Sequence, residues 1–174
     1  GKAPKRPQRP LRRAFQPGIE LCPLALADEL GKVFCEGDGL RQFARLGAQL
    51  VRVTDGQAHP QTGREQGIAW AVAGLSQLVE RTRDLGPTLA FENHAKPFVG
   101  QYTDFSQAPD IFVEIVRRTA GVGLGINFDT ANATAFAADP LALLELVIDR
   151  VVSVHAADTA VHGATSPVLG QRYR

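Results

Sequence analysis

Apolar residues recur along residues 38–155 in two different periods, and the two periods alternate. Short apolar runs typical of buried strands lie at 49–54, 88–92, 122–128 and 151–154. Between them, helical spacing is found at 38–47, at 64–85, from Asp104 or Ser106 to about Thr119, and after Asp139-Pro140. Helices that alternate with strands in this way predict an α/β fold with a parallel sheet.

The pattern also predicts how individual helices begin, end and pack. The helix over 64–85 stops at Gly86-Pro87, and Asp104 or Ser106 is expected to cap the helix that follows the second strand. After Asp129 the apolar run breaks into small residues, which is expected to end the third strand at this carboxylate. The helix after Asp139 is expected to bury one apolar face, made of Leu141, Leu144, Leu146 and Val147.

The two ends of the chain have a different composition from its middle. Residues 1–17 are rich in proline, lysine and arginine and are predicted to be a disordered basic leader, while residues 18–174 form a single domain. Residues 18–25 could hold a short strand, but Pro23 argues against a central one. Residues 159–174 contain Gly163, Pro167 and Gly170 and are expected to be a loop.

Charge and cysteine usage exclude several classes of function. Residues 1–13 hold six cations and no acid while the whole chain has a net charge of +1, so the remainder is acidic and unlike a nucleic-acid binder. No apolar run approaches the roughly 20 residues that a membrane span needs. Cys22 and Cys35 are too few for a disulfide framework, which favours a reduced, cytoplasmic protein without membrane or nucleic-acid partners.

Three of the predicted strands end in a residue that can bind a metal. Glu92, Asp129 and His155 are separated by 37 and 26 residues, each about one strand-helix unit. Strand ends of a parallel array lie on one face, so the three side chains can converge there. Mixed carboxylate and imidazole ligands suit Mn²⁺, Mg²⁺, Co²⁺ or Zn²⁺. The alternative is that these polar residues only terminate strands and face water.

Other polar residues leave the same strand ends and are candidate substrate ligands. Asn93 and His94 follow Glu92 and could orient a substrate hydroxyl, although His94 could equally be a solvated loop residue. Arg52, near the end of the first strand, could bind a phosphate or carboxylate, or form a surface ion pair.

Two further candidates lie three residues beyond a metal-ligand candidate. Asn132 follows Asp129 and could bind substrate, cap a turn, or both; Asp158 follows His155 and could hold that ring or contact substrate hydroxyls. His59 and His162 fall in predicted loops and are not expected to be ligands.

The three strand-end motifs together resemble the sugar phosphate isomerase/epimerase family, in the xylose isomerase-like TIM-barrel superfamily. They are Leu89-Ala-Phe-Glu-Asn-His94, Gly125-Ile-Asn-Phe-Asp-Thr-Ala-Asn132 and Val152-Ser-Val-His-Ala-Ala-Asp158. The resemblance runs from about Leu40 to Gly170. It implies a (β/α)₈ barrel, of which this chain would supply roughly strands three to six.

What the resemblance implies for chemistry is one divalent metal ion at the C-terminal face of the barrel. By motif match, Glu92, Asp129 and His155 would be three of its four ligands. Glu92 would also act as one member of an acid/base pair that moves a proton next to a carbonyl, through an enediolate. The partner of such a site is a small carbohydrate.

The sequence departs from the family pattern at both ends, because such a barrel normally needs about 250 residues. The strand-eight glutamate, which is the fourth ligand and second acid/base group, is expected beyond Arg174. The chain is therefore expected to be a truncated member whose unpaired sheet edges favour self-association into homo-oligomers.

Three other functions are compatible with the sequence to different degrees. The chain could be an incomplete barrel that acts as a binding or interaction module. It could be a dehydratase of the same superfamily, because substrate choice lies in variable loops. An apurinic endonuclease is disfavoured, because that group has a histidine where this chain has Asn132, and because the body of the chain is acidic.

Overall fold

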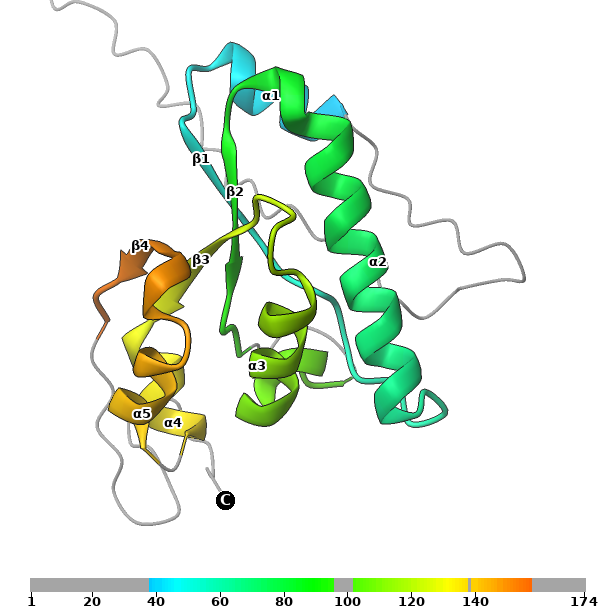
Figure 1. The fold of residues 1–174 in the computed structure, drawn as a ribbon, viewed down its shortest axis with the longest axis vertical. Helices are drawn as coiled ribbons and strands as arrows, with labels where there is room; N and C mark the ends of the chain where they lie inside the picture. The colour runs from blue at the N-terminus through cyan, green and yellow to red at the C-terminus, as the bar shows by residue number, and fades with distance from the viewer. Residues whose placement is uncertain (1–37, 96–101, 138, 158–174) are drawn as a thin grey trace, which may run out of the picture.

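Four parallel strands in one sheet form the centre of the fold (Figure 1). The structure is a computed structural model and describes residues 38–95, 102–137 and 139–157. The strands lie in the order β1-β2-β3-β4, which is also their order along the chain. The described elements are α1 (Asp38–Arg45), β1 (Leu50–Val53), α2 (Arg64–Thr82), η2 (Arg83–Leu85), β2 (Thr88–Glu92), η3 (Phe105–Gln107), α3 (Pro109–Arg118), β3 (Gly125–Asp129), α4 (Thr130–Phe136), α5 (Pro140–Glu145), η4 (Ile148–Arg150) and β4 (Val151–His155).

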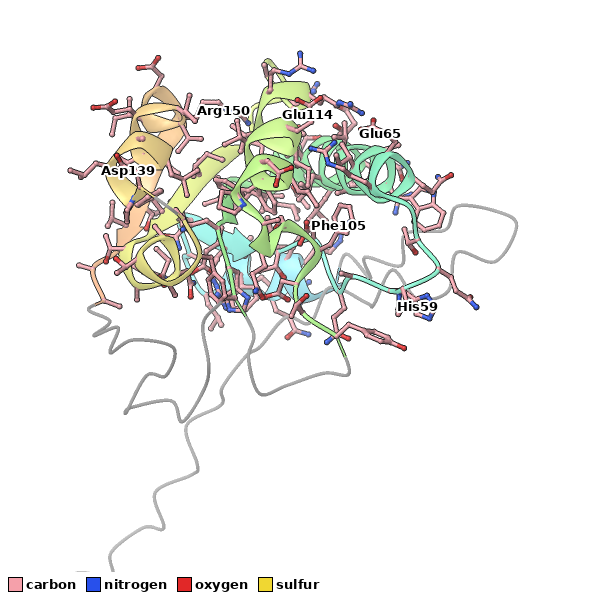
Figure 2. All side chains as sticks on the ribbon, turned by 90° about the horizontal axis from the view of Figure 1, so that it is seen from below. His59, Glu65, Phe105, Glu114, Asp139 and Arg150 are labelled. Carbon is pink, nitrogen blue, oxygen red and sulfur yellow. The ribbon has the colours of Figure 1, made fainter. Side chains whose placement is uncertain are left out.

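The predicted α/β fold with a parallel sheet is confirmed, and four neighbouring parallel strands constitute part of a barrel. Helices follow the strands along the chain, and α2, α3 and α5 lie in a layer on one side of the sheet (Figure 2). None of the described helices is long and apolar enough to cross a membrane. The basic leader, the region of Pro23, both cysteines, Asp158 and His162 lie outside the described residues, so the predictions made for them stay predictions.

Alternation along the strands separates an apolar core from a polar face. One set of strand side chains packs against α2 and α3, and the aromatic rings of Phe91 and Phe112 meet with centroids 5.2 Å apart. The core set comprises Val51, Val53, Leu89, Phe91, Ile126, Phe128, Ile68, Ala71, Leu75, Leu78, Phe112, Ile115 and Val116. Since neighbouring strand residues point to opposite faces, Glu92, Asn127 and Asp129 lie on the face away from this core.

The segment before α3 differs from the prediction. The helix begins at Pro109 with Ala108 as its N-cap, and neither Asp104 nor Ser106 caps it. Those two residues instead belong to the buried turn around η3. In this turn the ring of Phe105 packs on Gly67 of α2, and a Cβ at position 67 would lie only 2.2 Å from the ring. The helix starts at Pro109, because the fixed backbone angle of proline favours the first position of a helix.

The residues around β3 and α5 also differ from the prediction. The strand begins at Gly125, three residues later than predicted, and Asp129 caps a short helix, α4, that was not predicted. In α5 the buried residue is Leu143, whereas Leu141 and Leu146 of the predicted face are exposed. The other two predicted residues do face the core: Val147 is buried and Leu144 is partly buried against it. The helix is only two turns long, too short for apolar spacing to define its face.

The start of β4 is anchored to the turn between α3 and β3. The guanidinium of Arg150 donates to the carbonyl of Leu124 at 2.6 Å and to that of Val116, and it meets the hydroxyl of Thr119 at 3.3 Å. Burial lowers the pKa of Arg150 from its usual value. The cation thus satisfies carbonyls near the end of α3 and fixes where the last strand begins.

Candidate metal centre

Glu92, Asp129 and His155 come together at the C-terminal ends of β2, β3 and β4. One ligand atom from each side chain lies within 4.8 Å of the other two. The pairing register explains this arrangement, because Asp129 lies directly opposite His155 and Glu92 lies opposite Asn127, one layer below. The convergence predicted from the three strand ends is therefore present in the structure.

The three side chains already interact through one imidazole nitrogen. His155 Nδ1 lies 2.9 Å from Glu92 Oε1 and 3.5 Å from Asp129 Oδ2. Glu92 is almost fully buried, with 1% of its side chain exposed, whereas 46% of His155 is exposed. Two carboxylates and one imidazole are a donor set that a divalent cation accepts, so the residues present fit a metal ion.

Arg52 extends from β1 to the same carboxylate. Its guanidinium forms an ion pair with Glu92 Oε2, so both oxygens of Glu92 have partners. The guanidinium side chain is 41% exposed. Arg52 was predicted to bind a substrate anion or to form a surface ion pair, and the ion pair it forms is with the buried candidate ligand.

Asn93 and Asn132 hold the backbone and side chain of Asp129. Asn93 donates from Nδ2 to the carbonyl of Asp129 at 2.8 Å and accepts from its amide at 2.7 Å. The amide of Asn132 donates to Asp129 Oδ1 at 2.8 Å, which makes Asp129 the N-cap of α4. Both asparagines were predicted to contact substrate, and Asn132 alternatively to take part in capping a turn; in the structure the side chain of Asn93 and the backbone of Asn132 hold Asp129 in place.

His94 lies beside the centre rather than in the three-residue cluster. Its Nδ1 is 2.6 Å from Asp104 Oδ2 and donates to that carboxylate, which leaves Nε2 as the ring nitrogen that is directed elsewhere. His59 is stacked edge-to-face on Tyr102, with ring centroids 5.3 Å apart, and belongs to no ligand cluster among the residues described. Asp158 lies outside the described residues.

A buried acidic pair next to His94 was missed by sequence reasoning. Asp55 follows β1 and has 6% exposure; burial and the nearby charge of Asp104 raise its pKa to about 7, although Ser106 opposes the rise. Within the described chain neither carboxylate oxygen of Asp55 has a hydrogen bond of ordinary geometry. The signal was available, because Asp55 follows a predicted strand as directly as the other strand-end residues do.

Asn127 was also missed, although it lies on the same face as Asp129. It has 0% exposure, and neither its amide nitrogen nor its amide oxygen has a partner among the residues that the structure describes. The two-residue period of a strand would have placed it directly below the metal-ligand candidates. Burial of an amide without hydrogen-bond partners lowers the stability of the fold, so Asn127 is expected to destabilise it.

We expect Asn127→Leu to raise the free energy of unfolding by about 1–2 kcal/mol, because it removes an unpaired buried amide without changing the volume greatly. The matched change Asn93→Leu should lower it by a similar amount, since two hydrogen bonds to Asp129 are lost. Urea denaturation of both variants measures the difference. Equal destabilisation by the two changes would mean that Asn127 has a partner after all.

Comparison with protein families and solved structures gives one consistent result. A family model described as xylose isomerase-like TIM barrel matches residues 38–171. No curated protein matches the sequence. The solved structures described next have the same fold at 14–22% identity, and the chain spans about half of their length.

Three of these structures illustrate the range. A D-tagatose 3-epimerase-like protein is 22% identical, with a TM-score of 0.58 over 72% of this chain and 47% of that one. The IolI protein with a bound zinc atom is 19% identical, with a TM-score of 0.61 over 75% of this chain and 45% of that one. The probable 3-DHS dehydratase AsbF from Bacillus anthracis is 14% identical, with a TM-score of 0.61 over 79% and 48%.

Proposed function

Because this chain belongs to the xylose isomerase-like TIM barrel family, we propose that it contributes the metal-binding half of an isomerase or epimerase. Its substrate is a sugar, a sugar phosphate or a related polyol or keto acid. The observation that carries the proposal is the cluster of Glu92, Asp129 and His155, whose ligand atoms lie within 4.8 Å of one another. The zinc-bound IolI protein and the D-tagatose 3-epimerase-like protein, which share the fold, support it.

The three side chains divide the work between binding and proton transfer. A bound divalent ion supplies a Lewis acid that polarises the oxygens of a hydroxy-carbonyl substrate. Asp129, His155 and Glu92 would hold the ion at the end of the sheet. Glu92 would also take the proton from the carbon next to the carbonyl, which gives an enediolate of the substrate.

The environment of Glu92 suits a base of this kind. Its burial keeps bulk water from the carboxylate, and Arg52 fixes the orientation of Oε2. Glu92 is the single glutamate of the cluster in the described part of the chain. The resemblance assigns the return of the proton to a second glutamate, from a later strand of a complete barrel.

Residues around the cluster are proposed to face the substrate. The Arg52 side chain is 41% exposed, so while it pairs with Glu92 its remaining N–H groups are proposed to bind a phosphate or carboxylate group. His94 offers Nε2 to a hydroxyl, since its Nδ1 is held by Asp104. The side chain of Asn132, at the start of α4, and Asp158 are proposed to contact further hydroxyls.

A second candidate function is that of an interaction module. Val152 and Val154 of the edge strand β4 are each about half exposed, at 50% and 51%, so this edge offers an apolar surface to another barrel segment or a second copy. In that case the cluster would bind a metal ion without turning over a sugar.

An exchange experiment distinguishes the two. The purified chain is incubated with Mn²⁺ and a panel of ketohexoses that includes D-tagatose and D-allulose, in ²H₂O. Isomerase or epimerase chemistry predicts metal-dependent deuterium incorporation next to the carbonyl, detected by NMR and abolished by Glu92→Gln. Metal binding without any incorporation would leave the interaction module and overturn the enzymatic proposal for this chain.

A further inference from the structure

The last strand contains one residue more than its neighbour requires, and this irregularity sets where His155 lies. Ile126 pairs with Val151, but the next pair is Asn127 with Ser153, so Val152 has no partner on β3. This extra residue is a β-bulge, and it lies about two residues before the pair of Asp129 and His155. Bulges re-aim the side chains that follow them.

Without the bulge the ligand would lie on the wrong face. Continuing the Ile126–Val151 register would place Val154 opposite Asp129 and move His155 beyond the end of the pairing. A shift of one residue also turns a side chain to the other side of the sheet. With the bulge, Asp129 faces His155 and the imidazole reaches Glu92 at 2.9 Å.

Space for the bulge comes from a missing side chain on β3. A Cβ at Gly125 would lie 2.5 Å from Cγ2, 3.0 Å from Cγ1 and 3.3 Å from Cβ of Val152. Rotation of the valine about χ1 cannot relieve the contact fully, because its own Cβ is already closer than an ordinary contact. Gly125 is therefore the residue that lets the bulged strand approach β3.

Contacts at both ends of β4 keep the strand from sliding away. Arg150 ties its start to the carbonyls of Val116 and Leu124. The hydroxyl of Thr130 donates to the carbonyls of His155 and Ala157 at its end. A side chain at position 125 would push against Val152 and, because both ends of β4 are held, would bend this strand away from β3. The imidazole of His155 would then move away from Glu92 and Asp129.

We propose that Gly125 and the bulged Val152 are positioning residues that hold His155 in the metal site by packing of the valine against the glycine backbone. The inference rests on the proposed metal site and adds to it a reason for its geometry. It assigns a function to two residues that contact no ligand atom themselves.

The test is a double-mutant cycle on metal affinity, measured by calorimetric titration of Zn²⁺ and by the Zn²⁺-induced rise in Tm. Gly125→Ala should weaken Zn²⁺ binding by about 10- to 100-fold, as losses of supporting contacts around metal ligands do. In the V152G background the same change should cost less than about threefold, because the valine that it strikes is gone. The V154G background is the matched control, and there the full loss should remain.

The possible outcomes separate a failure of the metal site from a failure of the positioning inference. If the unmodified chain binds no Zn²⁺, the metal site itself fails, and the positioning inference fails with it. If that chain binds but folded Gly125→Ala binds equally well, or loses as much affinity in the V152G background, the positioning inference alone is wrong. If Gly125→Ala does not fold, recovery of folding and of binding in the V152G background supports the inference, and no recovery overturns it.

Discussion

Replacing Glu92 by glutamine is expected to weaken divalent-metal binding by more than about 100-fold, beyond the loss caused by removing an outer supporting contact. The amide keeps the shape of the side chain but loses the charge that faces both His155 and Arg52. It also leaves the guanidinium of Arg52 as an uncompensated cation beside the ion. The measurement is the rise in Tm on adding Mn²⁺ or Zn²⁺, which should vanish in the variant.

The matched control is Glu114→Gln on the exposed surface of α3. Glu114 pairs with Arg117 and Arg118, which hold its pKa at about 2, so this carboxylate is also ionised and paired. Its loss should leave the metal-induced rise in Tm unchanged. A metal response that survives in Glu92→Gln, or disappears in both variants, would contradict the assignment of Glu92 as a ligand.

Asp55 is expected to make the chain less stable as the pH rises from about 4 to about 7. Burial and the charge of Asp104 raise its pKa from 3.8 to about 7 in the folded state. Between these values the unfolded chain has released the proton while the folded chain retains it, so folding takes up a proton and loses stability with rising pH. Above about 7 both states are ionised and the loss is complete, with an upper limit of about 4 kcal/mol.

Asp55→Asn should therefore be more stable than the unmodified chain at pH 8 and close to it at pH 4, as measured by urea denaturation at both values. The neighbouring Asp104 and His94 are present in both proteins, so the difference between the two curves isolates Asp55. Asp110→Asn, at an exposed carboxylate paired with Arg64, is the control and should show no such trend. A difference that grows toward low pH would contradict the buried position of Asp55.

The parts of this molecule that follow from periodicity could be predicted from the sequence. The strands β2, β3 and β4 are each a short apolar run ending in a polar residue, and parallel strands bring those ends together, so the cluster of Glu92, Asp129 and His155 was foreseen. The helix over 64–85 was foreseen nearly to its last residue, because its apolar stripe is long.

What could not be predicted depends on contacts between distant segments. The bulge at Val152 is possible because Gly125 leaves room for it, and no pattern within either strand predicts that the two residues meet. The contact of Arg52 with Glu92 and the pairing of Asp104 with His94 join residues 40 and 10 positions apart. Asp104 was expected at a helix start because its residue type favours caps, but tertiary packing placed it beside a histidine.

The proposed function requires above all that Glu92, Asp129 and His155 together hold one divalent ion. X-ray absorption spectroscopy of the Zn²⁺-loaded chain tests this directly. We expect one imidazole nitrogen and otherwise oxygen ligands, at about 2.0–2.2 Å. Sulfur at about 2.3 Å would instead assign the ion to Cys22 or Cys35, and several imidazoles would assign it to the other histidines; either result would contradict the proposed centre.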